Sequence, residues 1–181
     1  REVAKTYPDI LIQMDAYATG AFPPISEIKP EKNVAVKVAL GHGDPKRYRD
    51  PFRSYRHPSN QVTGQIISDW SRIAQTCIWD YWIDFYGRSH YPSTNVLAIA
   101  ENLRFYHELG IDYVFAECEK PSQVSLHALR IWIGYRLMNH LELDVRQEMQ
   151  RFMQAYYGQA APMLMEYHDL VQAGNDRLEA S

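Results

Sequence analysis

The segments Ile73-Ala-Gln-Thr-Cys-Ile-Trp-Asp-Tyr81 and Ile111-Asp-Tyr-Val-Phe-Ala-Glu-Cys-Glu119 decide the fold, since each is a short apolar run that ends in carboxylates. Runs of this length and composition are typical of buried parallel strands. The segment between them, Thr94–Leu109, has apolar residues at helical spacing. A strand, a helix and a second strand predict a βαβ unit in which both strands end at the same edge of one sheet.

The same alternation extends toward the N-terminus. Asp9–Tyr17 and Asn33–Leu40 have the character of further strands, and Gln61–Ala74 has apolar residues at helical spacing. Ile25–Lys32 is short, polar and bounded by prolines, so we expect no full helix between the first two strands. Repeated strand–helix alternation predicts a parallel sheet with right-handed crossovers.

The chain has 181 residues, and from Ser125 onward its pattern is that of long helices. A closed (β/α)8 barrel needs about 200–250 residues or more. We therefore predict an α/β fold: the C-terminal half of a TIM-type barrel, with about four parallel strands, over residues 1–122, followed by a helical tail over residues 123–181. The opening Arg-Glu-Val-Ala-Lys resembles the end of a helix. We therefore expect a piece of a longer protein, whose N-terminal half supplies the remaining strands.

The composition is that of an ordinary globular domain, with 46% hydrophobic residues, 23% charged residues and a net charge of −3. No stretch approaches the roughly 18 apolar residues of a membrane span. The mild negative charge gives no reason to expect nucleic acid or an anionic membrane as a partner.

The polar and aromatic residues at the carboxyl ends of the strands form the candidate site, because ligands bind at that edge in α/β folds. Asp80, Glu117 and Glu119 are the candidate catalytic residues, since converging carboxylates serve general acid–base chemistry on a sugar. The candidate substrate-binding residues, at the same strand ends, are Asp15, Tyr17, His42, Asp44, Trp79 and Tyr81.

Strand alternation refines this hypothesis, because side chains two residues apart point to the same face. Glu117 and Glu119 therefore share the face of Phe115, and Asp80 shares the face of Ile78. If all the carboxylates serve one glycosidase site, the carboxyl groups of Asp80 and Glu117 lie within roughly 10 Å of each other in one cleft.

Each of these residues also has a purely structural interpretation. Asp15 can cap a loop, and the His42-Gly-Asp44 stretch can shape a turn. Either glutamate can form an ion pair with a lysine such as Lys37, which itself lies inside a predicted strand. Lys37 points either into a polar cleft or to a sheet surface.

The sequence indicates neither a metal site nor a cofactor. No histidine pair has the i,i+4 spacing of metal ligands on a helix, and His127 and His140 are expected at helix surfaces or in helix packing. Cys77 and Cys118 have no obvious base nearby in the sequence and are expected to be buried thiols. The basic loop Lys46–Arg56 either holds an anionic group such as a uronate carboxylate or is simply solvated.

Several short motifs together resemble a bacterial domain family of uncharacterised activity. The motifs are Tyr7-Pro-Asp9 before a strand, Ile78-Trp-Asp-Tyr81, Gly110 followed by Val114-Phe-Ala-Glu117, Tyr156-Tyr-Gly158, Ala160-Ala-Pro162 and Tyr167. That family is similar to the catalytic barrel of α-glucuronidases and, more remotely, of β-hexosaminidases. The resemblance covers nearly the whole chain, but only the second half of the barrel.

The resemblance implies a glycoside hydrolase-like (β/α)8 barrel followed by helices. In α-glucuronidases an Asp and a Glu on late strands are the candidate bases, and Asp80 and Glu117 match them by strand end. The acid, a Glu on an earlier strand, belongs to the half that this chain does not contain. The resemblance also implies a secreted or periplasmic location.

Three functions from different classes remain open. The first is a glycoside hydrolase acting on a uronic-acid-containing or N-acetylated oligosaccharide or polysaccharide, with the isolated chain inactive because it lacks the acid. The second is a non-catalytic carbohydrate-binding or scaffold domain, which predicts an aromatic-lined cleft without paired carboxylates. The third is an α/β interaction module whose helical tail packs against a partner domain.

Overall fold

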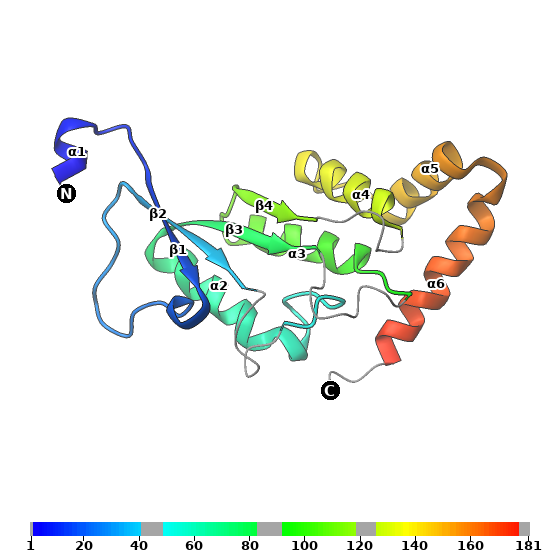
Figure 1. Cartoon of the computed structure of the whole chain (residues 1–181), viewed down its shortest axis with the longest axis horizontal. Coiled ribbons are helices and arrows are strands. Elements are labelled where there is room, and N and C mark those ends of the chain that lie inside the picture. The colour runs from blue at the N-terminus through cyan, green and yellow to red at the C-terminus, as the bar shows by residue number, and fades with distance from the viewer. Residues whose placement is uncertain (1, 41–48, 83–91, 119–125, 178–181) are drawn as a thin grey trace.

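The computed structural model describes residues 2–40, 49–82, 92–118 and 126–177 (Figure 1). Within these residues four strands form one sheet in the order β1-β2-β3-β4, and every neighbouring pair is parallel. The strands are β1 Ile12–Tyr17, β2 Val34–Ala39, β3 Gln75–Tyr81 and β4 Val114–Glu117. The α-helices are α1 Glu2–Thr6, α2 Gln61–Ile73, α3 Val96–Glu108, α4 His127–Asn139, α5 Val145–Tyr157 and α6 Ala161–Arg177.

The predicted α/β class and the parallel sheet are confirmed. The first strand begins at Ile12 rather than at Asp9, because the Ile10 amide donates to the Tyr7 carbonyl in a turn just before it. No α-helix forms in residues 21–33, as the prolines there predicted. The crossover from β1 to β2 is therefore made by a single 3₁₀ turn, Ala18–Gly20, and extended chain.

The strand register sorts the side chains onto two faces. Ala16, Val38 and Ile78 lie side by side in one row, and all three are buried. This face packs against the helices and is called the helix-covered face. It belongs to one continuous core with apolar residues of α2, α3 and α4, for example Ile67, Ile99 and Ile133.

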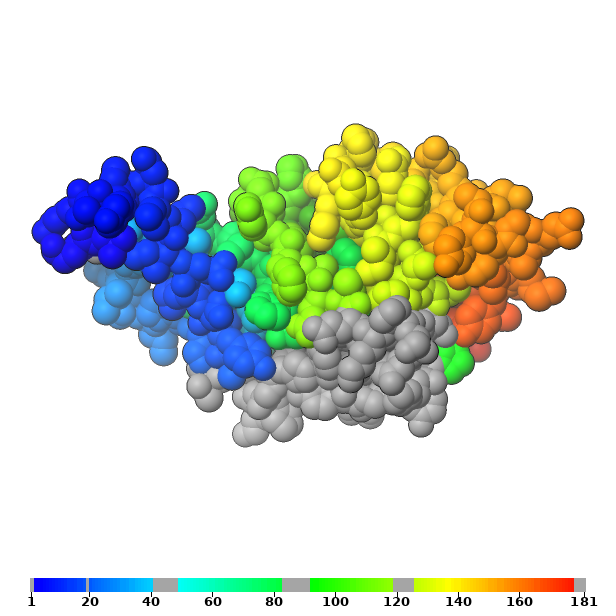
Figure 2. Space-filling view, turned by 45° about the horizontal axis from the view of Figure 1, so that its top comes forward, coloured from blue at the N-terminus to red at the C-terminus, as the bar shows by residue number. Residues whose placement is uncertain are grey.

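The helical tail joins the same core. Helix α4 packs on α3, and α5 and α6 follow at the end of the molecule away from α1 (Figure 1). Figure 2 shows the N-terminal residues, in blue, and α5, in orange, at opposite ends of the molecule. Among the described helices, none combines the length and apolar character that a membrane-spanning segment needs.

The residues at two helix ends suit the local backbone geometry. Gly110 follows α3 with φ +71, the left-handed conformation that glycine adopts without strain. Asp144 caps α5, because its Oδ1 accepts a hydrogen bond of 2.9 Å from the Gln147 amide.

Candidate functional site

The second face of the sheet carries polar and aromatic side chains. Its central row aligns Tyr17, Ala39, Trp79 and Phe115. Phe115 is 53% exposed, so this part of the face is open among the described residues. The side chains that define this polar aromatic face are Asp15, Tyr17, Lys37, Trp79, Tyr81, Phe115 and Glu117.

Trp79 is the centre of this face. Its indole Nε1–H donates a hydrogen bond of 2.7 Å to Oε2 of Glu117. Its ring meets Phe115 edge-on, with centroids 4.8 Å apart, and lies nearly parallel to Tyr81, with centroids 6.3 Å apart. These contacts hold the indole and the carboxylate in a fixed relation to each other.

Lys37 lies on the same face and is not in the core. Its Nζ is 3.1 Å from Oδ1 of Asp15 and 4.5 Å from the centroid of the Trp79 ring. The cation is therefore held by a carboxylate and by the π face of an indole. Lys37 was expected either in a polar cleft or at a sheet surface, and it lies on the surface of the sheet that carries Asp15 and Trp79.

Two titratable groups on this side of the sheet, Tyr81 and Cys77, have raised pKa values and remain protonated near neutral pH. Burial, with smaller contributions from Tyr17, Glu117 and Asp15, raises the pKa of Tyr81 to about 12. Burial also raises the pKa of Cys77, although Lys37 opposes this shift. Tyr81 can therefore donate a hydrogen bond, and the Cys77 thiol is not activated as a nucleophile.

Asp80 does not belong to this face, and the expectation that it shares a cleft with Glu117 is wrong. Asp80 pairs with Ala116 across the sheet, whereas Glu117 pairs with Tyr81. Because neighbours along a strand point to opposite faces, the two carboxylates lie on opposite sides of the sheet. Matching the two residues by strand end alone could not detect this.

The Asp80 carboxylate is fully buried, with 0% exposure. Arg49 Nη1 lies 2.5 Å from its Oδ1, and the Tyr55 hydroxyl donates to the same oxygen over 3.3 Å. The Tyr106 hydroxyl and the Trp82 indole donate to its Oδ2 over 2.8 and 3.3 Å. Four donors therefore occupy the two oxygens, and the carboxylate has no access to a substrate or to a catalytic water.

The charges on this network stabilise one another. Burial alone would lower the pKa of Arg49, but the Asp80 carboxylate holds it above its ordinary value. Burial, followed by the charge of Asp80, raises the pKa of Tyr106 well above its ordinary value. The network thus joins the loop before α2, the end of β3 and α3 inside the core.

The described arginines of the basic loop bind groups of the same chain. Arg49 pairs with Asp80, Arg53 donates to the carbonyl of Asn175, and Arg56 contacts Glu108. Of the two interpretations of this loop, an anion site formed by its described arginines is therefore not favoured. Lys46, Arg47 and Tyr48 lie outside the described residues.

The structure brings together five of the nine predicted site residues on the polar aromatic face. These are Asp15, Tyr17, Trp79, Tyr81 and Glu117. Asp80 lies on the other face, and His42, Asp44 and Glu119 lie outside the described residues. Phe115 also lies on the polar aromatic face, although it was not among the predicted site residues. Its spacing of two residues from Glu117 was the signal that could have identified it.

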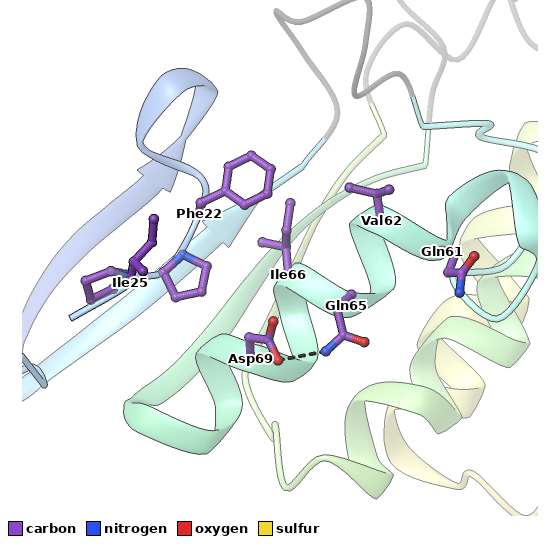
Figure 3. A pocket seen from close by; sticks show the side chains of 9 residues that line it. Phe22, Ile25, Gln61, Val62, Gln65, Ile66 and Asp69 are labelled. Carbon is purple, nitrogen blue, oxygen red and sulfur yellow. Dashed lines mark hydrogen bonds between the residues drawn. The ribbon is translucent and has the colours of Figure 1, made fainter. Parts of the chain in front are cut away.

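A separate groove of about 560 Å³ lies between the segment after β1 and helix α2 (Figure 3). Phe22, Ile25, Val62 and Ile66 give it an apolar lining. The groove contains none of the predicted site residues, so it is distinct from the polar aromatic face.

Comparison with known proteins gives one match. The model of a family described as "Domain of unknown function (DUF4838)" matches residues 1–169. No curated protein and no solved structure matches the chain.

Proposed function

The chain belongs to the DUF4838 family, and we propose that its polar aromatic face is the glycan-binding wall of a glycoside hydrolase-like barrel. One observation carries this proposal. The Trp79 indole lies beside Lys37 while its Nε1–H holds the Glu117 carboxylate. The face thus combines an aromatic surface, on which sugar CH groups stack, with charged groups that bond to sugar hydroxyls.

The half-barrel is the architecture that best accommodates this face. Parallel sheets are normally covered on both faces, and in a (β/α)8 barrel the helices lie outside while the inner side chains meet at the axis. Here α2 and α3 pack on one face only, so the polar aromatic face takes the place of the barrel interior. The exposed apolar residues Leu11 and Ile12 beside the β1 edge support pairing with further strands of the same protein.

The charges on the face favour glycans that carry an acidic or N-acetyl group. Lys37 can bond to a uronate carboxylate or to the carbonyl oxygen of an N-acetyl group. Uronic-acid-containing and N-acetylated oligosaccharides are therefore the proposed ligand classes.

Glu117 is the carboxylate of this face that we assign to hydrolysis, as a general acid or base. Asp15 lies on β1, at the opposite edge of the described sheet from β4, and its carboxylate is paired with Lys37 over 3.1 Å. Asp15 therefore serves to position Lys37. The second catalytic carboxylate would come from the remaining strands of the barrel.

A non-catalytic glycan-binding domain is the second candidate function. It is favoured by the burial of Asp80 on the other face, which removes the predicted carboxylate partner of Glu117 from this face. In this case the aromatic platform binds the glycan, and Glu117 only accepts hydrogen bonds from its hydroxyls.

Calorimetric titration with three probes tests glycan binding: aldouronic acid oligosaccharides, N-acetylchitooligosaccharides and neutral cello-oligosaccharides. We expect one of the first two to bind and Trp79→Ala to weaken that binding about tenfold or more, which corresponds to ~1.4 kcal/mol. Tyr135→Ala is the matched control, because Tyr135 is an exposed aromatic residue on α4. Trp79→Phe serves as a second variant if the alanine variant does not fold.

Glu117→Gln separates the two candidate functions. In the full-length parent it abolishes hydrolysis and retains binding if Glu117 is catalytic. It affects only binding if the domain is a binding module. No binding of any probe, or equal losses in Trp79→Ala and Tyr135→Ala, contradicts the proposal.

A further inference from the structure

Arg130 lies in the first turns of α4 and is only 3% exposed, yet the part of the chain that the structure describes supplies no counter-charge for it. Its Nε has no hydrogen-bond partner, and none of the described carboxylates forms an ion pair with its guanidinium. A buried charge without a counter-charge is costly, and arginines are rarely buried unless they are paired. This residue therefore has the features of a ligand-binding group whose ligand is an anion.

Arg49 and Arg130 differ in whether a carboxylate accompanies the buried guanidinium. Both guanidinium groups are buried and both have an Nε without a hydrogen-bond partner, but Arg49 lies 2.5 Å from the Asp80 carboxylate and its pKa is raised. Burial lowers the pKa of Arg130 to about 10, and only Cys118, at the end of β4, opposes this shift. Within the described ranges, one buried arginine thus has a carboxylate partner and the other has none.

His127 adds a second buried nitrogen on the same side of the helix. It precedes Arg130 by three residues, so the two side chains are neighbours on the helix surface. Its Nδ1 is buried without a partner, and burial followed by the charge of Arg130 lowers its pKa. Two nitrogen-bearing side chains at this helix end therefore have atoms available to an acceptor.

The helix end itself favours negative charge. Helix α4 has 13 residues, and no side chain caps it at Leu126. The first amides of a helix have no partner within it, and the helix dipole adds partial positive charge there. These amides and the two side chains are consistent with one small, negatively charged ligand.

We propose that the N-terminus of α4, with His127 and Arg130, is a binding site for a small oxyanion, namely a carboxylate or a phosphate group. Arg130 forms a bidentate pair with two of its oxygens, and His127 and the first helix amides bond to the others. Cys118, which Arg130 faces, has the strand parity of Asp80, so the site lies toward the helix-covered face. It is distinct from the polar aromatic face and does not depend on glycan binding there.

Thermal unfolding at constant ionic strength tests the site, with chloride replaced stepwise by phosphate or by acetate. We expect the Tm of the wild-type protein to rise saturably with at least one of these anions. Arg130→Met removes the charge at similar volume. It should abolish the saturable rise, and in chloride its Tm should equal or exceed that of the wild type.

Arg136→Met is the matched control on the same helix. Arg136 pairs with Glu148 over 2.9 Å, so this variant should lose stability in every buffer but keep the saturable rise. If Arg130→Met does not fold, Arg130→Lys serves instead. It should weaken anion binding about tenfold or more because lysine lacks the bidentate fork.

An NMR titration of the His127 imidazole gives an independent result. A bound anion favours the charged imidazolium, so saturating phosphate or acetate should raise the pKa of His127. The proposal is overturned if neither anion gives a saturable rise in Tm, or if Arg130→Met and Arg130→Lys both keep the full rise. A rise with phosphate alone assigns a phosphate group, and a rise with acetate alone assigns a carboxylate.

Discussion

Arg49 Nη1 lies 2.5 Å from Oδ1 of Asp80, and both side chains are buried in the core. This ion pair fixes the loop before α2 to the end of β3, and the hydroxyls of Tyr55 and Tyr106 also donate to the Asp80 carboxylate. Asp80 is therefore a structural residue, although it ends a strand at the edge where ligands bind in such folds.

Removing one partner of this pair should be strongly destabilising. Asp80→Ala leaves the Arg49 charge buried and uncompensated, which typically costs about 3–5 kcal/mol. The double variant Asp80→Leu with Arg49→Met should lose less stability than Asp80→Ala, because neither charge remains. Urea unfolding measures the free energy of unfolding of each variant. Equal losses of stability in the single and double variants would show that the uncompensated Arg49 charge is not the cause of the destabilisation.

Gly134 permits the close approach of α4 to Trp82. A Cβ at this position would lie 2.0 Å from Cη2 of the Trp82 indole. Gly134→Ala should therefore destabilise the fold, by about 1–3 kcal/mol as is typical of overpacked cores. Gly174→Ala on α6 is the control. Its Cβ would meet nothing within 4 Å, so the change should be neutral or stabilising by about 0.5–1 kcal/mol.

Lys37→Met tests the charge on the polar aromatic face. The variant removes both the ion pair with Asp15 and the contact with the Trp79 ring. We expect binding of aldouronic acid oligosaccharides to weaken about tenfold, while binding of neutral oligosaccharides changes little. Lys5→Met, on α1, should change neither. Equal effects on charged and neutral glycans would assign Lys37 a structural role.

His168 should make stability depend on pH. It is 1% exposed, and burial lowers its pKa although Asp169 opposes the shift and Arg146 adds to it. The unfolded chain therefore takes up a proton below about pH 6.5 that the folded chain resists. Stability is complete above that pH and falls as the pH drops toward the folded pKa.

His168→Gln should consequently reduce the slope of the free energy of unfolding against pH between pH 7 and pH 5. His127, whose pKa is also lowered, contributes in the same direction, so part of the slope should remain. Arg146 lowers the pKa of Asp169, so the contribution of Asp169 to stability is lost only at more acidic pH. Urea unfolding at several pH values measures the slope, and an unchanged slope in the variant would refute the assignment to His168.

Much of the sheet could be predicted from the sequence, because four apolar runs separated by turn or helix signals leave few alternatives. The alternation of side chains along each strand could also be predicted from the sequence. Phe115 and Glu117 share one face of β4, and Ile78 and Asp80 share one face of β3. The sequence did not reveal that these are opposite faces. That depends on the register, in which Asp80 pairs with Ala116, and register is determined by packing of the whole sheet.

The partners of Asp80 were equally inaccessible from the sequence. Arg49 is 31 residues away and Tyr106 is 26 residues away, so only tertiary folding brings them together. Lys37 could be recognised as unusual inside an apolar strand, but its contact with Trp79 likewise requires the neighbouring strand. Local patterns thus indicated which residues are unusual, and the fold decided which of them meet.

The most direct test of the glycan-binding proposal is the NMR signal of the Trp79 indole Nε1–H, which is bonded to Glu117. The signal is identified as the indole resonance missing from Trp79→Phe and is followed during titration with aldouronic acid and N-acetylchitooligosaccharides. We predict that it shifts progressively with one of these probes, while the Trp132 indole on α4 does not. An unchanged Trp79 signal with both probes would contradict glycan binding at this face.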